Sequence, residues 1–149
     1  MKIKTVITDI THDDLVNLFS TAIYGSEYLD CGIPKGNYKG TPLEDDCDCR
    51  EDKWAKVLLS GKSIYVYDYY SEECDYGNLQ HKWIESKQAM RYEVTLEDIR
   101  KGLERAVARD DRDHLYDEVM HLMTEDDRFD ICEAECLLQY IVFGEVVYG

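Results

Sequence analysis

Apolar residues recur at helical spacing in the stretch that begins near residue 11. They form one stripe along a helix face: Leu15, Leu18, Phe19, Ala22 and Ile23. Thr11 and Asp14 match a capping box, in which each side chain satisfies a free backbone N–H at the start of a helix. Gly25 is a plausible stop. The pattern predicts a helix that ends near Gly25, and the apolar stretch from Ile3 to Ile7 predicts a preceding strand.

Three later stretches have the same spacing, and two of them open with a capping box. Thr95 and Asp98 form one box, and Asp130 and Glu133 form the other. The inner positions of the three predicted helices are Ile99, Leu103, Ala106 and Val107; Leu115, Val119, Leu122 and Met123; and Ala134, Leu137, Leu138 and Ile141. Gly144 is expected to end the last helix, before an apolar tail or short strand.

The middle of the chain has the pattern of strands. Residues 63 to 70 are rich in aromatic and β-branched residues, and Leu79 to Glu85 and Met90 to Val94 predict two more strands. Residues 74 to 78 predict a turn between them. Short successive strands favour an antiparallel meander. The expected fold is α+β: a small antiparallel sheet of three or four strands packed with about four helices.

A long loop is predicted at about residues 30 to 52, within a single domain that spans residues 1 to 149. Five residues that break regular structure lie in it: Gly32, Pro34, Gly36, Gly40 and Pro42. Six carboxylates crowd its end: Glu44, Asp45, Asp46, Asp48, Glu51 and Asp52. A short helix with Trp54, Val57 and Leu58 on one face is expected to follow. Loops of this length are often functional, so the six acids are candidate partner-binding residues.

Tyrosines alternate along the strongest predicted strand. Tyr65, Tyr67 and Tyr69 point to one sheet face, and Ile64 and Val66 point to the other. The aliphatic pair is the natural core side. The tyrosine face is then a candidate platform for a base, a nucleotide or a partner protein, unless a helix or loop covers it.

The charge pattern narrows the classes of partner. The chain carries 32 Asp and Glu against 17 Lys and Arg, a formal net charge of −15. Such a field repels nucleic acid and anionic membrane and attracts basic surfaces, although it also serves solubility. The N-terminal residues lack an apolar signal region, and no run of residues is long enough to span a membrane. The expected location is therefore the cytoplasm.

Metal and catalytic motifs are weak. Cys31, Cys47, Cys49 and Cys74 could supply four thiolates, but one residue between Cys47 and Cys49 is too few for the usual zinc knuckle. A zinc site there stays open as an alternative, and no metal or cofactor is expected.

One helix face also carries His114, Glu118 and His121, without the order of a zinc-protease motif. A solvated face is the simpler reading of these residues. Nucleophile elbows, Walker loops and dinucleotide fingerprints are absent, so we expect a protein that is not an enzyme.

Three segments resemble a group of small acidic proteins encoded by phages and prophages of Gram-positive bacteria. They are Thr11 to Gly25, Gly61 to Asp68 followed by Val94 to Leu103, and Cys136 to Gly149. The resemblance implies a mobile-element protein that acts inside a bacterial cell. It carries over no activity and no catalytic residue.

Three functions are compatible with these features. The first is an anti-CRISPR-like binding protein that inhibits a nucleic-acid-handling host defence factor through a basic surface of that factor, without binding nucleic acid itself. The second is a sponge for a small nucleotide signal, in which the tyrosine face stacks the base. Phosphate would then be held by some of Arg91, Arg100, Arg105 and Arg109. The third is a structural or regulatory phage protein that forms a homodimer.

Overall fold

The computed structural model describes residues 9–37, 50–70, 79–108, 115–124 and 128–148. In chain order the elements are α1 (His12–Gly25), β1 (Leu29–Gly32), α2 (Arg50–Leu59), β2 (Ile64–Asp68), β3 (His81–Ile84), the short 3-10 helix η1 (Glu85–Lys87), β4 (Ala89–Val94), α3 (Leu96–Ala108), α4 (Leu115–Met123) and α5 (Ile131–Phe143). The α+β class is confirmed, with five α-helices in these residues. None of those helices combines the length and the apolar composition needed to cross a bilayer.

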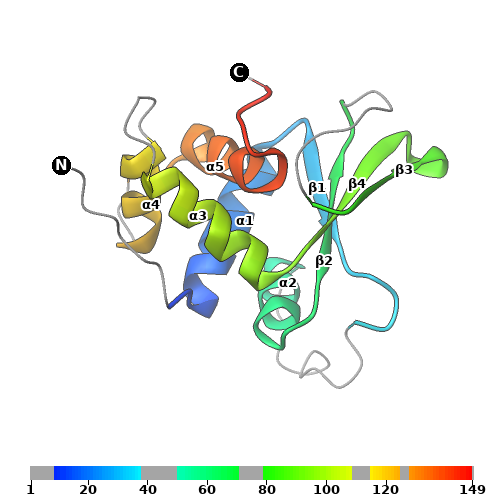
Figure 1. The fold of residues 1–149 in the computed structure, drawn as a ribbon, viewed down its shortest axis with the longest axis horizontal. Helices are drawn as coiled ribbons and strands as arrows, with labels where there is room; N and C mark the ends of the chain where they lie inside the picture. The colour runs from blue at the N-terminus through cyan, green and yellow to red at the C-terminus, as the bar shows by residue number, and fades with distance from the viewer. Residues whose placement is uncertain (1–8, 38–49, 71–78, 109–114, 125–127, 149) are drawn as a thin grey trace.

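The four strands form one antiparallel sheet in the order β1-β2-β4-β3. The helices lie together on one side of this sheet (Figure 1). The predicted meander is wrong in one respect, because β2 pairs with β4 and leaves β3 at the edge. A physical reason is the polarity of β3: its Lys82 is exposed, and short strands with lysine suit sheet edges, whereas β4 is largely buried.

Part of the predicted loop is ordered. Leu29 to Gly32 form the edge strand β1, with Leu29 and Cys31 buried on the core side. The predicted loop also extended too far, because α2 begins at Arg50. Residues 38–49, the predicted strand at Ile3 to Ile7 and the predicted turn at residues 74 to 78 lie outside the described residues.

The capping boxes form as predicted at two helices. At α1, the Asp14 N–H donates to the Thr11 hydroxyl at 3.1 Å, and the Thr11 N–H donates to the Asp14 carboxylate at 3.0 Å. Thr95 and Asp98 repeat both contacts at α3. At α5 the Glu133 N–H donates to Asp130, and Gly144 ends the helix with φ of 81°.

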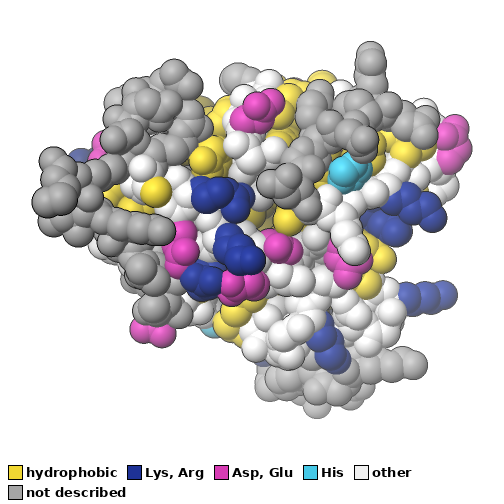
Figure 2. Space-filling view, in the orientation of Figure 1, with side chains coloured by type: hydrophobic (Ala, Val, Ile, Leu, Met, Phe, Trp, Pro, Cys, Tyr) yellow, Lys and Arg dark blue, Asp and Glu magenta, His cyan; other side chains and the backbone are white. Residues whose placement is uncertain are grey.

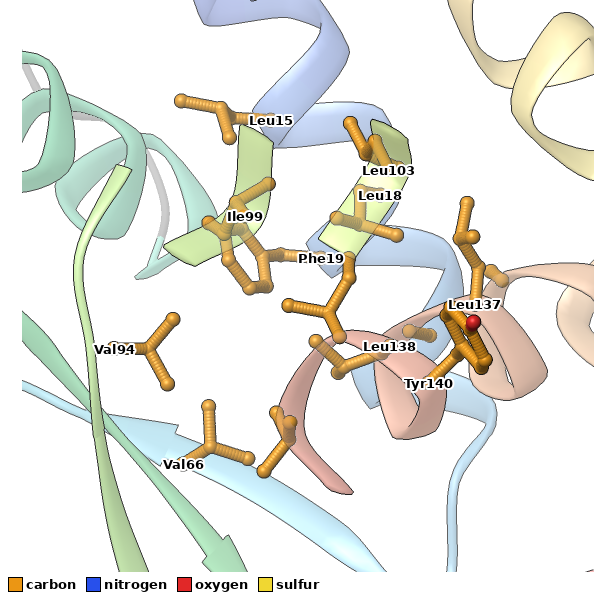
Figure 3. Close-up of a cluster of buried hydrophobic side chains, with 14 of the residues drawn as sticks. Leu15, Leu18, Phe19, Val66, Val94, Ile99, Leu103, Leu137, Leu138 and Tyr140 are labelled. Carbon is orange, nitrogen blue, oxygen red and sulfur yellow. The ribbon is translucent and has the colours of Figure 1, made fainter. Parts of the chain in front are cut away.

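The core lies between the sheet and the helices. Figure 3 shows Val66 and Val94 from the sheet facing side chains of α1, α3 and α5, including Phe19, Ile99 and Leu138. All of the predicted inner positions of α3 and α5 are buried, as are all those of α4 except Met123. Trp54, Val57 and Leu58 of α2 are buried as well.

A buried glutamine holds the segment that follows α5. Gln139 is fully buried, and its side-chain carbonyl accepts the N–H groups of Val147 and Tyr148 at 2.9 and 2.7 Å. Its amide donates to the Tyr148 carbonyl at 3.2 Å. The Tyr148 hydroxyl then donates to the buried Asp68 carboxylate at 2.8 Å. The predicted tail is thus an irregular segment with defined hydrogen-bond partners.

Candidate functional site: a tyrosine and basic face of the sheet

The two faces of β2 differ as its alternation predicts. Ile64 and Val66 are fully buried against the helices. Tyr65 and Tyr67 alternate with them along the strand and therefore lie on its opposite side. None of the five described α-helices covers that side (Figure 1). We call this side the outer sheet face and define it by Tyr65, Tyr67, Tyr69, Lys82, Lys87 and Arg91, which share it by alternation, strand register or ring contact.

The three tyrosines form a ladder along the strand. The Tyr65 and Tyr67 ring centroids are 6.1 Å apart, and Tyr67 stacks on Tyr69 at the same spacing. Gly32 of the neighbouring strand lies beneath Tyr67, where an added Cβ would sit 3.2 Å from the ring. Tyr67 is therefore buried, whereas Tyr69 is 37 % exposed. Burial raises the pKa of both phenols, so both are neutral hydrogen-bond donors near pH 7.

Cations lie over two rungs of this ladder. The Arg91 guanidinium carbon is 4.0 Å from the Tyr65 ring centroid, and Lys87 Nζ is 4.9 Å from the Tyr67 centroid. Strand register sets Lys82 directly opposite Arg91. Among the described residues, no carboxylate forms an ion pair with any of these three cations. Like charges directly opposite each other in a sheet are unfavourable, so this pair lowers stability without a ligand.

The backbone beside Lys87 is constrained. Gln88 adopts the left-handed conformation with φ of 49°, which is uncommon for a residue other than glycine. Its side-chain amide donates to the Glu85 carbonyl at 2.8 Å, and its backbone N–H donates to the same carbonyl at 3.2 Å. These bonds hold the tight turn that places Lys87 over Tyr67.

A shallow hollow of about 140 Å³ lies at the Arg91 end of the face. Six residues line it: Tyr65, Gln80, His81, Lys82, Arg91 and Glu93. Glu93 accepts a hydrogen bond from the Ser63 hydroxyl at 2.7 Å. Pockets that enclose whole drug-sized ligands are typically about 300 Å³ or more, so this hollow suits one phosphate-sized group.

Of the six acidic residues predicted to bind a partner, the structure describes two, and it places both in α2. Glu44, Asp45, Asp46 and Asp48 lie outside the described residues. Glu51 and Asp52 are buried in the first turn of α2 rather than displayed in a loop. Glu51 accepts a hydrogen bond from the Tyr24 hydroxyl at 3.1 Å, and Asp52 contacts His12 Nε2. Both carboxylates therefore join α1 to α2.

The arginines that the sequence offered as phosphate ligands do not all lie at one site. Arg91 lies on the outer sheet face, whereas Arg100 lies on α3, where Glu97 and Glu104 pair with it. Arg109 lies outside the described residues. Lys82 and Lys87 were not predicted as site residues, because only the pairing of β3 with β4 brings them beside the tyrosines.

Cysteine and histidine do not assemble a metal site among the described residues. Of the four thiols considered for zinc, only Cys31 is described, and burial raises its pKa well above the usual value. Burial, with nearby acids, also raises the pKa of Cys136 to about 11. His121 Nδ1 lies 2.7 Å from Glu133, Glu118 is buried, and His114 is outside the described residues.

Charge is divided between two parts of the molecule. The described residues of 9–37, 115–124 and 128–148 hold two Lys or Arg and eleven Asp or Glu, a net charge of −9. The described residues of 50–70 and 79–108 hold ten Lys or Arg and eight Asp or Glu, a net charge of +2. Figure 2 shows Lys and Arg side chains both over α3 and at the side where β3 lies. The part of the chain that contains α2, α3 and three of the four strands is thus weakly basic in a strongly acidic protein.

Comparison of the chain with protein-family models, with curated proteins and with solved structures gives no match. The resemblance to phage-encoded acidic proteins therefore stays a prediction.

Proposed function

We propose that this chain is a non-enzymatic binding protein that holds a phosphate-bearing nucleotide on its outer sheet face. The observation that carries the proposal is the group of three cations, Lys82, Lys87 and Arg91, beside tyrosine rings and without an ion-pairing carboxylate among the described residues. Phosphate accepts charge-assisted hydrogen bonds from such cations, and aromatic rings and guanidinium planes stack on bases.

The net charge of −15 is compatible with a small ligand. Salt screens charges over roughly 8 Å at physiological ionic strength, so a small anion at the sheet is governed mainly by the nearest cations. A bound phosphate would also relieve the repulsion between Lys82 and Arg91 across the two strands.

Titration calorimetry with adenosine nucleotides, cyclic nucleotides and ADP-ribose tests this function. We expect measurable heat with at least one of them and a loss of affinity of about tenfold or more in Arg91→Ala, because a charge-assisted contact is lost. Lys101→Ala is the matched control, since Lys101 is an exposed cation on α3, away from the face. Absence of heat with every nucleotide, or unchanged affinity in Arg91→Ala, would contradict the proposal.

A second candidate follows from the division of charge. The acidic part that contains α1, α4 and α5 suits a basic surface on another protein, as an anti-CRISPR-like inhibitor of a host nucleic-acid-handling factor requires. Asp13, Glu27 and Glu145 are exposed acids of this part. They could act together with Glu44, Asp45, Asp46 and Asp48 of the predicted loop.

Cleavage of DNA by a purified CRISPR effector tests the second candidate. We expect the wild-type chain to inhibit cleavage less as salt rises, and charge reversal at Asp13, Glu27 and Glu145 to weaken inhibition by about tenfold. Charge reversal at Glu85 is the control. This exposed acid lies in residues 79–108, outside the acidic part, so its reversal should change inhibition little. Inhibition that ignores both salt and the triple reversal would exclude this surface.

A further inference from the structure

We infer, on the basis of the proposed nucleotide site, that the ligand is a dinucleotide with two phosphodiester groups, one for each cation–tyrosine pair. The outer sheet face contains the same unit, a cation over a tyrosine ring, two times. Arg91 lies over Tyr65, and Lys87 lies over Tyr67, the next tyrosine along the same strand face. A ligand with a single phosphate would use only one of these units.

The spacing of the units favours phosphates on successive nucleotides. The two rings beneath the cations are 6.1 Å apart at their centroids. The two phosphates of a pyrophosphate share one bridging oxygen and therefore lie closer together than these two rings do. Two phosphodiesters separated by a sugar have a longer repeat, so each can meet its own cation.

The shape of the face requires a ligand that lies across it. The hollow of about 140 Å³ beside Arg91 and Lys82 can take a phosphate but cannot enclose a nucleoside. The bases must then lie on the open surface. The exposed Tyr69 ring and the Arg91 guanidinium plane both offer stacking surfaces there.

Acidic residues border the two cation–tyrosine pairs on the outer sheet face, and this limits the length of the ligand. Asp30 is the register partner of Tyr67 on β1, and Glu93 is the register partner of Tyr65 on β4. These acids border the two units on the same face. A longer nucleic acid would meet them and the wider field of a chain with charge −15.

Calorimetry with a cyclic dinucleotide and the matching 3′,5′-cyclic mononucleotide tests the inference, because both have the same base and one charge per nucleotide. We expect the dinucleotide to bind about tenfold more tightly or better, since it gains a second charge-assisted contact. ADP, whose two phosphates are adjacent, should bind no better than the mononucleotide. A single-stranded hexanucleotide should not exceed the dinucleotide.

Two variants test which cation binds which phosphate of the dinucleotide. Lys87→Ala should reduce dinucleotide affinity to about the mononucleotide level, whereas Arg91→Ala should weaken the binding of both ligands. Lys101→Ala again serves as the control, and thermal melting checks that each variant is folded. Equal affinity for the mononucleotide and the dinucleotide, or tighter binding of ADP or the hexanucleotide, would overturn the dinucleotide inference alone. Absence of binding by every nucleotide would overturn the proposed function as well.

Discussion

Replacing Gln139 by alanine should lower the free energy of unfolding by about 3 kcal/mol, because a buried donor or acceptor left without a partner costs about 1–3 kcal/mol. The side chain is fully buried and makes three hydrogen bonds to the backbone of Val147 and Tyr148. Water can satisfy part of the loss, since the two released residues are only half-buried. Chemical denaturation with circular dichroism measures the change.

Two variants test the cause. Tyr148→Phe removes the hydroxyl contact with the Asp68 carboxylate and keeps the backbone bonds to Gln139, so its cost measures the Asp68 contact separately. Cys132→Ala changes an exposed position on the same helix and should stay within about 0.5 kcal/mol of the wild type. A Gln139→Ala protein that is as stable as the Cys132→Ala protein would show that the glutamine contacts contribute nothing.

The helices were predictable because their signals are local. Thr11 with Asp14 and Thr95 with Asp98 determine two starts through bonds that span three residues. Gly144 ends α5 because its left-handed conformation is easy for glycine. None of these features depends on the rest of the fold.

The order of the strands was not predictable in the same way. Pairing of β2 with β4 joins segments that are distant in sequence, and the alternation of each strand is compatible with several neighbours. β1 was missed because its four residues lie at the start of a stretch rich in glycine and proline. Gln139 was missed because a polar residue on a helix ordinarily faces solvent.

The candidate site combines both kinds of information. Alternation alone separates Tyr65 and Tyr67 from Ile64 and Val66, which belong to the core between the sheet and the helices. The cations over the rings required the register, because Lys87 reaches Tyr67 only through the turn between β3 and β4. Overall composition pointed away from such a site, since the net charge of −15 does not show that the described residues of 50–70 and 79–108 have a net charge of +2.

Replacing Gly102 by alanine should lower the free energy of unfolding by about 2 kcal/mol, although alanine is the better helix former by about 1 kcal/mol. Gly102 lies on α3 where it meets α5. A Cβ at this position would lie 2.8 Å from Ile141 Cγ1 and 3.0 Å from Ile141 Cα. The second contact involves backbone, so α5 itself must move, and overpacking of this kind costs about 1–3 kcal/mol or more.

Denaturation of Gly102→Ala, Ile141→Ala and the double variant separates crowding from helix propensity. Ile141→Ala alone should cost about 2–5 kcal/mol, because it leaves a cavity at a buried site. The new methyl of Gly102→Ala fills part of that cavity, so the double variant should lose less stability than the two single variants together. Lys101→Ala, at the exposed neighbour, should change stability little. Strict additivity, or a Gly102→Ala protein more stable than the wild type, would mean that the α3–α5 contact accommodates the methyl group without strain.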